Sequence, residues 1–175
     1  TGDERQRRPA HGTLVGQRHK HRGHVHQRGE PPPTRTNITR PGDAYADHVL
    51  TALILDYGGV LTDPGDDRDF PLLRALLNAR RHGLKTALLS NAGGTASDEI
   101  TELFDVVVMD GVKPNVEAYE RTAAALGVPA AECVFVDDLR GNVQGAVATG
   151  MVGVHHTDPA TTLIELNALF GVDLE

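Results

Sequence analysis

The sequence predicts an α/β domain built around a buried parallel sheet. Two observations predict this fold. First, short apolar runs alternate with amphipathic stretches from residue 48 onward, which is typical of successive βαβ units. Second, polar residues follow several of the apolar runs. Parallel sheets bind their ligands at the edge where the strands end, so this pattern also indicates a binding site.

The expected strands and helices alternate along the chain. We expect strands, each a short apolar run, at residues 50–56, 85–90, 105–109, 132–137 and 151–155. We expect helices between and after them at residues 70–82, 96–103, 115–126, 140–149 and 159–169. Gly83 and Gly127 stand where helices should end, and Pro114 stands where a helix should begin. These are the helix positions that glycine and proline favour.

The composition is that of one ordinary domain. The chain of 175 residues is long enough for a real core, and with 4% aromatic residues that core must consist mainly of Val, Leu, Ile and Ala. The single cysteine, Cys133, excludes an internal disulfide and is expected to be a small buried side chain. No apolar stretch is long enough to span a membrane, and no export signal is apparent. We therefore expect a cytoplasmic protein without membrane contact.

The first 46 residues differ in character from the rest. Residues 1–45 carry nine Lys/Arg and four acidic residues, a net of +5, whereas the remaining 130 residues carry 8 basic and 20 acidic residues, a net of −12. Large apolar residues are almost absent here, so we expect a disordered basic tail at 1–46 and a core domain at 47–175. Nucleic-acid binding is not expected except through this tail, which lacks interleaved aromatic residues. A metal site at His19, His21, His24 and His26 would need a scaffold that is not visible.

Carboxylates follow the first and fourth predicted strands. Asp56 ends the first strand, and Asp137 and Asp138 end the fourth. Taken singly, each could be a turn, cap or surface residue. Brought together at one edge, three carboxylates would repel one another unless a cation lay between them. Oxygen ligands of this kind suit Mg²⁺, which is therefore the expected cofactor.

Groups that suit a phosphoryl oxygen follow the second and third strands. Ser90 ends the second strand, and Lys113 follows the third after a short loop. The hydroxyl, the ammonium and the backbone N–H groups from Asn91 onward could bind phosphate oxygens. A carboxylate held beside a metal and facing phosphorus, such as Asp56, is a candidate nucleophile.

Four segments together resemble the ordered motifs of the haloacid dehalogenase (HAD) superfamily of hydrolases. The segments are LDYGGVLTD, LLSNAGG, GVKPNVEAY and FVDDLRGNVQGAVATGM, and the resemblance covers residues 50–157. It implies a doubly wound, Rossmann-like sheet of five parallel strands in the order 5-4-1-2-3. It also implies that the glycine-rich stretch after the first strand forms a turn and flap.

The resemblance assigns roles to the residues at the sheet edge. It implies that Asp56 is nucleophile and metal ligand and that the carbonyl of Gly58 is a further ligand. Asp138 would bind the metal directly, and Asp137 directly or through water.

The remaining motif positions would hold the substrate. Ser90, Asn91 and Lys113 would bind the phosphoryl group, and Lys113 would also offset the acidic cluster. Asn142 is expected to orient the fourth loop rather than to contact substrate.

Position 58 departs from the pattern of the family's phosphatases, which carry there a second Asp that protonates the leaving oxygen. Gly58 offers only its backbone, and loss of a general acid/base costs about 10²–10⁴-fold in rate. A Mg²⁺-dependent phosphatase remains the first interpretation. A regulatory or binding module with little turnover is the second. Haloacid dehalogenation is the third, because dehalogenases of the family also lack this Asp, although they place an aromatic residue there and need no metal.

The loop after Gly58 contains acids that could replace the missing proton carrier. They are Asp63, Asp66, Asp67 and Asp69. A run of acids in a loop rich in glycine and proline is more often simply solvated, and that interpretation is preferred.

The segment between the first two motifs is too short for a helical cap. Residues 57–89 comprise 33 positions, and the expected helix at 70–82 uses many of them. An open site excludes water poorly and offers little surface for selecting a small molecule. The resemblance therefore implies either a large, macromolecular phosphorylated substrate or closure by a partner subunit, as in a homodimer.

Overall fold

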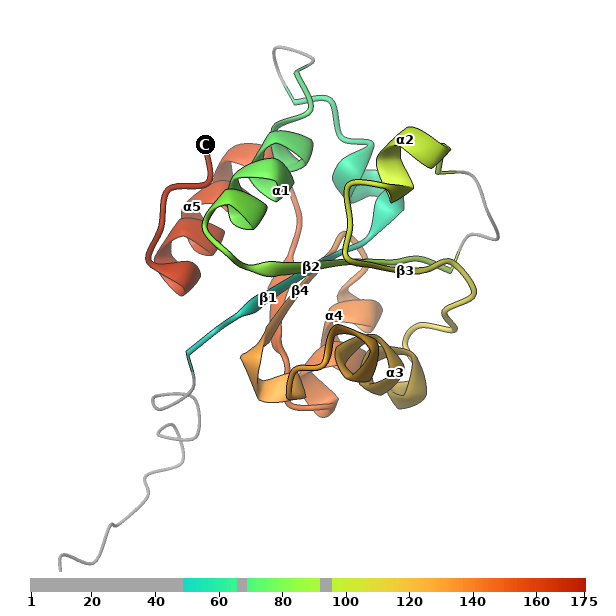
Figure 1. The fold of residues 1–175 in the computed structure, drawn as a ribbon. Helices are drawn as coiled ribbons and strands as arrows, with labels where there is room; N and C mark the ends of the chain where they lie inside the picture. The colour runs from blue at the N-terminus through green and yellow to red at the C-terminus, as the bar shows by residue number, and fades with distance from the viewer. Residues whose placement is uncertain (1–48, 66–68, 92–95) are drawn as a thin grey trace, which may run out of the picture. The chain divides into compact units, whose positions relative to one another are not determined.

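The computed structural model describes residues 49–65, 69–91 and 96–175 (Figure 1). The chain divides into two units, Thr1–Ile38 and Thr39–Glu175, and the first lies outside the described residues. The expected disordered tail at 1–46, with its four histidines, also lies outside them. The boundary at residue 46 therefore stays a prediction.

Five parallel strands form a single sheet. They are β1 (Ala52–Leu55), β2 (Lys85–Leu89), β3 (Val106–Val108), β4 (Cys133–Asp137) and β5 (Val152–His155). Their order is β3-β2-β1-β4-β5, with β1 in the centre (Figure 1). This is the expected order 5-4-1-2-3 read from the opposite edge, so the doubly wound topology is confirmed.

The helices lie on both faces of the sheet (Figure 1). The α-helices are α1 (Pro71–Arg81), α2 (Asp98–Thr101), α3 (Val116–Leu126), α4 (Arg140–Ala148) and α5 (Pro159–Phe170). The described residues also form two short turns, the π-helical η2 (Tyr57–Leu61) and the 3₁₀ turn η3 (Ala130–Glu132). The helices and strands expected from the sequence agree with these bounds to within two residues at each end.

The helix boundaries follow local chemistry, with one correction. Gly127 ends α3 with φ +69°, and Gly83 follows α1 with φ +82°, a backbone conformation that glycine adopts without strain. The expectation that Pro114 begins a helix was wrong. Pro114 lies within a separate turn closed by the bond from Asn115 N to Val112 O at 2.8 Å, and Asn115 stands at the N-cap position of α3 without a side-chain cap bond.

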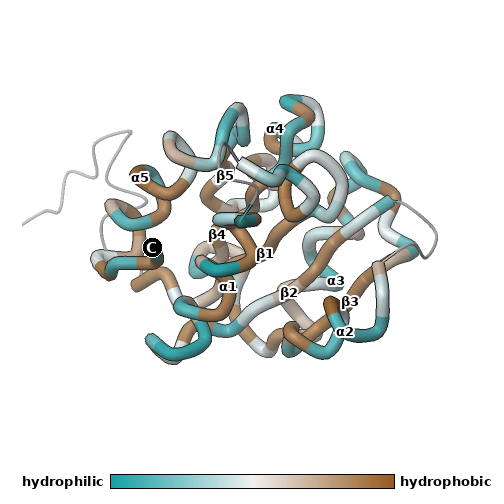
Figure 2. The backbone as a smooth tube through the Cα atoms, turned by 90° about the horizontal axis from the view of Figure 1, so that it is seen from above, coloured by the Kyte–Doolittle hydropathy of each residue, from teal (hydrophilic) through white to brown (hydrophobic). Residues whose placement is uncertain are grey.

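Alternate residues of the central strand pack into two separate cores. Leu53 and Leu55 face a core completed by α1 and α5, whereas Ala52 and Ile54 face one completed by α3 and α4. All four side chains are fully buried. Figure 2 shows the resulting apolar centre at β1 and β4. Burial on both faces explains why these strands read as continuous apolar runs rather than alternating ones.

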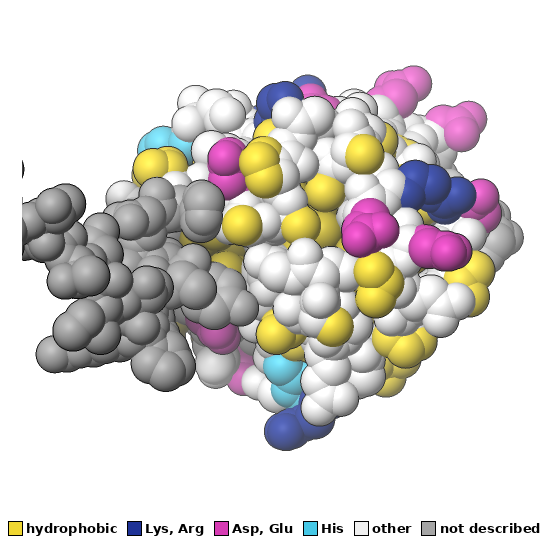
Figure 3. Space-filling model, turned by 90° about the horizontal axis from the view of Figure 1, so that it is seen from below, with side chains coloured by type: hydrophobic (Ala, Val, Ile, Leu, Met, Phe, Trp, Pro, Cys, Tyr) yellow, Lys and Arg dark blue, Asp and Glu magenta, His cyan; other side chains and the backbone are white. Residues whose placement is uncertain are grey.

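The outer face over α3 and α4 has a mixed surface. Acidic, basic and small apolar side chains are interspersed on it (Figure 3), as is usual for a solvated face. Among the described residues, no helix is both long and apolar enough to cross a membrane.

The carboxyl edge of the sheet is left open by the described elements. Between β1 and β2 the described chain forms only η2 and α1, and between β2 and β3 only α2. The expectation that no helical cap is inserted here therefore holds for the described part of these connections.

Candidate active site

Asp56 is fixed at the end of the central strand. Its backbone N–H donates to Val136 O at 3.0 Å, which continues the ladder between β1 and β4 by one residue. The residue is 8% exposed, and the chain turns sharply into η2 directly after it. A carboxylate is thus held at the lip of the sheet, with its backbone anchored and its side chain largely shielded from water.

Lys113 links the two central strands through its ammonium. Nζ lies 2.7 Å from Asp56 Oδ1 and 2.6 Å from Asp137 Oδ2, and the side chain is 1% exposed. The same atom lies 5.3 Å from the centroid of the Phe135 ring, a cation–π contact from β4. A buried charge needs partners to offset the loss of hydration, and Lys113 has two carboxylates.

Asp137 is saturated with hydrogen-bond donors. Besides Lys113, its oxygens accept from Leu139 N at 2.8 Å and from Asn142 Nδ2 at 3.0 and 3.1 Å. The Tyr119 hydroxyl in turn donates to Asn142 O at 2.7 Å, which connects α3 to α4. Asn142 therefore orients the fourth loop, as expected, and does so by holding Asp137.

The three carboxylates are close enough to share one cation. Single oxygens of Asp56, Asp137 and Asp138 lie within 4.8 Å of one another. Three carboxylates and one ammonium leave a local charge of −2, which a divalent cation would balance. Hard oxygen ligands are the set that Mg²⁺ prefers. The described residues therefore fit a Mg²⁺ ion.

Burial and ion pairing act on Asp56 in opposite directions. Burial, the largest cause, raises its pKa above the usual value; the hydrogen bond and charge of Lys113 lower it, and the charge of Asp137 adds to the rise. A nucleophilic carboxylate must be ionised. A cation at the shared site would favour the ionised form, so the site's chemistry is consistent with a metal-dependent nucleophile.

Ser90 and Asn91 lie at the end of the neighbouring strand. Ser90 is 3% exposed and follows β2 directly. Asn91 holds the Lys113 loop, because its side chain donates to Lys113 O at 2.9 Å and accepts from Lys113 N at 2.7 Å. This contact explains how the loop after β3 returns to the site. Phosphate binding by the backbone after Asn91 stays a prediction, since residues 92–95 lie outside the described set.

The two glycines of η2 have different surroundings. Beyond its two chain neighbours, a Cβ at Gly58 would have no heavy atom of the described residues within 4 Å, whereas one at Gly59 would lie 2.5 Å from Asp138 Oδ2. Gly59 also has φ +75°. Glycine is therefore required at 59, where the turn packs directly on the carboxylate, but not at 58.

The described flap acids are paired outside the carboxylate cluster. Asp63 faces the buried His156, with Oδ2 at 3.1 Å from Nε2, and Asp69 pairs with Arg74 at 2.8 Å. His156 Nδ1 also meets Thr162 Oγ1 of α5 at 2.8 Å. Asp66 and Asp67 lie outside the described residues. The structure thus gives Asp63 and Asp69 structural partners.

Sequence reasoning missed three residues that shape the site. Tyr119 fixes Asn142, His155 has Nε2 3.0 Å from Asp138 O, and His156 anchors the flap. The strand-end rule could have identified His155, because it ends β5 in register with Asp137. Tyr119 and His156 act across the fold, and no local signal marks them.

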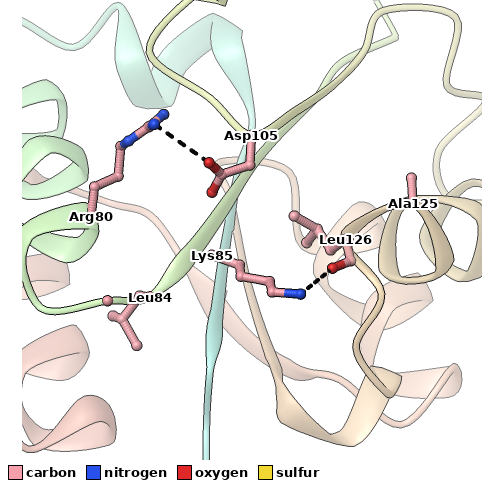
Figure 4. A pocket seen from close by; sticks show the side chains of 7 residues that line it. Arg80, Leu84, Lys85, Asp105, Ala125 and Leu126 are labelled. Atoms are coloured by element: carbon pink, nitrogen blue, oxygen red, sulfur yellow. Dashed lines mark hydrogen bonds and ion pairs between the residues drawn. The ribbon is translucent and has the colours of Figure 1, made fainter.

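A cavity at the opposite edge of the sheet carries none of this chemistry. It has a volume of about 460 Å³ and lies beside the amino ends of β2 and β3 (Figure 4). Its charged groups have partners of their own: Arg80 Nη2 lies 3.4 Å from Asp105 Oδ1, and Lys85 Nζ donates to Leu126 O at 2.7 Å. We therefore assign the site to the carboxyl edge.

Comparison with known proteins agrees with this geometry. A family model described as haloacid dehalogenase-like hydrolase matches residues 8–150. A solved structure of an uncharacterized protein from Corynebacterium glutamicum is similar, with a TM-score of 0.62 and 35% identity over 70% of this chain and 96% of that one.

Two relatives carry the name phosphatase. A sesquiterpene phosphatase from Aspergillus oryzae is 34% identical over 61% of this chain and 58% of its own length. A phosphatase from Mycobacterium tuberculosis is 38% identical over 44% of this chain and 41% of its own. The chain therefore spans about half the length of these relatives.

Proposed function

Because the chain belongs to the haloacid dehalogenase-like hydrolase family, we propose that it is a Mg²⁺-dependent phosphatase that forms an aspartyl phosphate on Asp56. The observation that carries this proposal is the cluster of Asp56, Asp137 and Asp138, two of which, Asp56 and Asp137, contact the buried ammonium of Lys113. Its net negative charge favours a dication, and the dication together with Lys113 would attract a phosphoryl group.

Each residue has a distinct part in the proposed reaction. Asp56 attacks phosphorus, and Lys113 stabilises the charge on the phosphoryl oxygens while holding Asp56 in place. Ser90 and the backbone at Asn91 bind the remaining phosphoryl oxygens. Both Ser90 and Lys113 are buried, so their positions are fixed before substrate arrives, which lowers the cost of orienting it.

The metal would be held by Asp56, the carbonyl of Gly58 and Asp138. Asp137 would bind it directly or through water, since its own oxygens already accept from Leu139 and Asn142. Bound there, Mg²⁺ would supply charge stabilisation to the phosphoryl oxygens.

The open edge bears on the class of substrate. Without a cap the site has few walls to select a small molecule, so a macromolecular phosphorylated substrate, or closure by a second subunit in a homodimer, belongs to this proposal. The two relatives named as phosphatases support a phosphorylated substrate. A cytoplasmic location stays a prediction.

Gly58 favours one alternative function. A module that accepts a phosphoryl group on Asp56 but releases it slowly would follow if no group activates water, and glycine cannot do so. Such a protein would signal through its phosphorylated state. Haloacid dehalogenation is the third candidate and would release halide without added metal.

The deciding experiment measures phosphate release from aryl and acyl phosphates in Mg²⁺ and in EDTA. Wild type is compared with Asp56→Asn, which keeps the side-chain shape but loses the nucleophile. Metal-dependent release that the variant lacks would support the phosphatase. Stable phosphorylation of Asp56 without release would support the regulatory module, and halide release from 2-haloacids in EDTA would support the dehalogenase.

A further inference from the structure

The described part of the chain leaves the space beside Gly58 open. Beyond its two chain neighbours, a Cβ at this position would meet no heavy atom of residues 49–65, 69–91 and 96–175 within 4 Å, and the backbone at φ −72°, ψ 130° suits any L-residue. The position lies two residues after Asp56, and the turn could accept a side chain there without strain. The chain therefore has room for a proton carrier beside the nucleophile but places none at this position.

The described titratable groups near the carboxyl edge of the sheet have partners of their own. Lys113 is held by two carboxylates, and Asp137 accepts from several donors. His155 faces the backbone carbonyl of Asp138, and Asp63 pairs with His156. Asp138 remains, and it belongs to the proposed metal site. Among the described residues, then, each candidate acid at this edge is engaged in the cluster or in the framework around it.

From this arrangement we infer that the protein acts on phosphate compounds whose leaving group departs without a proton. Acyl phosphates and aryl phosphates of acidic phenols belong to this class, and simple alkyl phosphates do not. The inference rests on the proposed function and specifies the substrate chemistry of the same site.

The first chemical step explains the selectivity. An oxygen of Asp56 forms a bond to phosphorus, the bond from phosphorus to the leaving oxygen breaks, and that oxygen departs with the electron pair as an anion. A carboxylate leaves readily, because its conjugate acid has a pKa of about 4. An alkoxide is nearly as basic as hydroxide, and it needs a proton during bond cleavage.

The second step depends less on an acid. Water attacks the phosphorus of the aspartyl phosphate, and the bond between phosphorus and Asp56 breaks with the electron pair returning to the carboxylate. The proton lost by water passes to a phosphate oxygen or to solvent. The leaving group is now a carboxylate whatever the substrate was, so only activation of water is impaired. With acyl phosphates this step should limit the rate and produce an initial burst of product.

The test is the dependence of kcat/KM on the leaving group's acidity. The probes are aryl phosphates from 2,4-dinitrophenyl to phenyl phosphate, together with acetyl phosphate and glycerol phosphate, all in Mg²⁺. We expect kcat/KM of the wild type to fall steeply as the leaving group becomes more basic, and glycerol phosphate to be the poorest substrate. A burst of one product per site should precede steady turnover of acetyl phosphate.

Two substitutions at position 58 form a matched pair. Gly58→Asp places an acid in the open space and should flatten the dependence, raising the rate for glycerol phosphate relative to acetyl phosphate by about 10²–10⁴-fold. Gly58→Ala fills the same space without a proton and should keep the steep dependence. The inference remains testable if either variant misfolds, because the wild-type series alone carries it.

The two proposals fail in different ways. Asp56-dependent turnover that is equally fast for phenyl and dinitrophenyl phosphate would overturn the inference alone, and would leave the phosphatase standing. The same leaving-group series measured on Asp66→Asn and Asp67→Asn would then test whether either residue supplies the proton. Folded, Mg²⁺-binding protein that transfers no phosphoryl group from dinitrophenyl or acetyl phosphate to Asp56 would overturn both.

Discussion

The side-chain amide of Asn142 donates to both carboxylate oxygens of Asp137, at 3.0 and 3.1 Å. This contact sets the orientation of a fully buried carboxylate that also meets Lys113. The site is therefore a network in which α4 holds the acid that ends β4, and that acid helps to hold Lys113 from the loop between β3 and α3. Networks of this kind respond to the loss of any member.

The amide contact predicts a loss of stability on Asn142→Ala. Removing Nδ2 takes a donor from a buried carboxylate, and we expect the free energy of unfolding to fall by about 1–3 kcal/mol. The measurement is urea unfolding in EDTA. Asn115→Ala is the control, since Asn115 is exposed and makes no side-chain cap bond, and should change stability by less than about 0.5 kcal/mol. Equal effects of the two variants would contradict the network.

The buried lysine predicts a metal-dependent stability on Lys113→Met. Without the ammonium, Asp56 and Asp137 lose their shared cation, and the metal-free protein should be destabilised by about 3–5 kcal/mol. Mg²⁺ should restore part of the lost stability, because it replaces the missing positive charge. Melting temperatures of the variant measured in Mg²⁺ and in EDTA test this prediction. Lys85→Met, which removes a lysine bonded to Leu126 O, should show the wild-type response to Mg²⁺. If Mg²⁺ stabilised both variants equally, Lys113 would not be balancing the cluster.

The paired glycines predict opposite results for one added methyl group. Gly59→Ala brings a Cβ to 2.5 Å from Asp138 Oδ2 at φ +75°, and should cost about 1–3 kcal/mol of stability and weaken Mg²⁺ binding. Gly58→Ala enters open space and should leave stability within about 1 kcal/mol of wild type or raise it. Calorimetric Mg²⁺ titration and thermal unfolding provide the comparison. A milder effect at 59 than at 58 would show that the turn does not rest on Asp138.

Cys133 predicts an inert thiol in the native protein. It is fully buried, and burial raises its pKa to about 11, so at pH 8 only about one thiol in a thousand would be the reactive thiolate. Because folding raises the pKa of this thiol, the neutral form predominates in the native protein. Reaction with iodoacetamide should be negligible in native protein and complete in urea, where the pKa returns to about 8.5. Rapid native labelling would contradict the packing of β4 against α3.

The parts of the fold that follow from local pattern could be predicted from the sequence. Apolar runs determined the strands, and the common edge of parallel strands brought Asp56, Lys113, Asp137 and Asp138 together as expected. Contacts between distant segments could not be predicted, because nothing local specifies them. Asn91 binding the Lys113 backbone and Tyr119 binding Asn142 are of this kind. The sequence also does not show which of the two neighbouring glycines in η2 the backbone requires.

The contact between His156 and Asp63 joins segments 93 residues apart. It fastens the far end of the turn after β1 to the base of α5, while Gly59 packs on Asp138 near the middle and Asp56 is paired into the sheet at the start. Because the stretch 56–63 is held at three points, it cannot move as a hinged lid. Shelter for the reacting phosphorus would therefore have to come from outside the stretch 56–63.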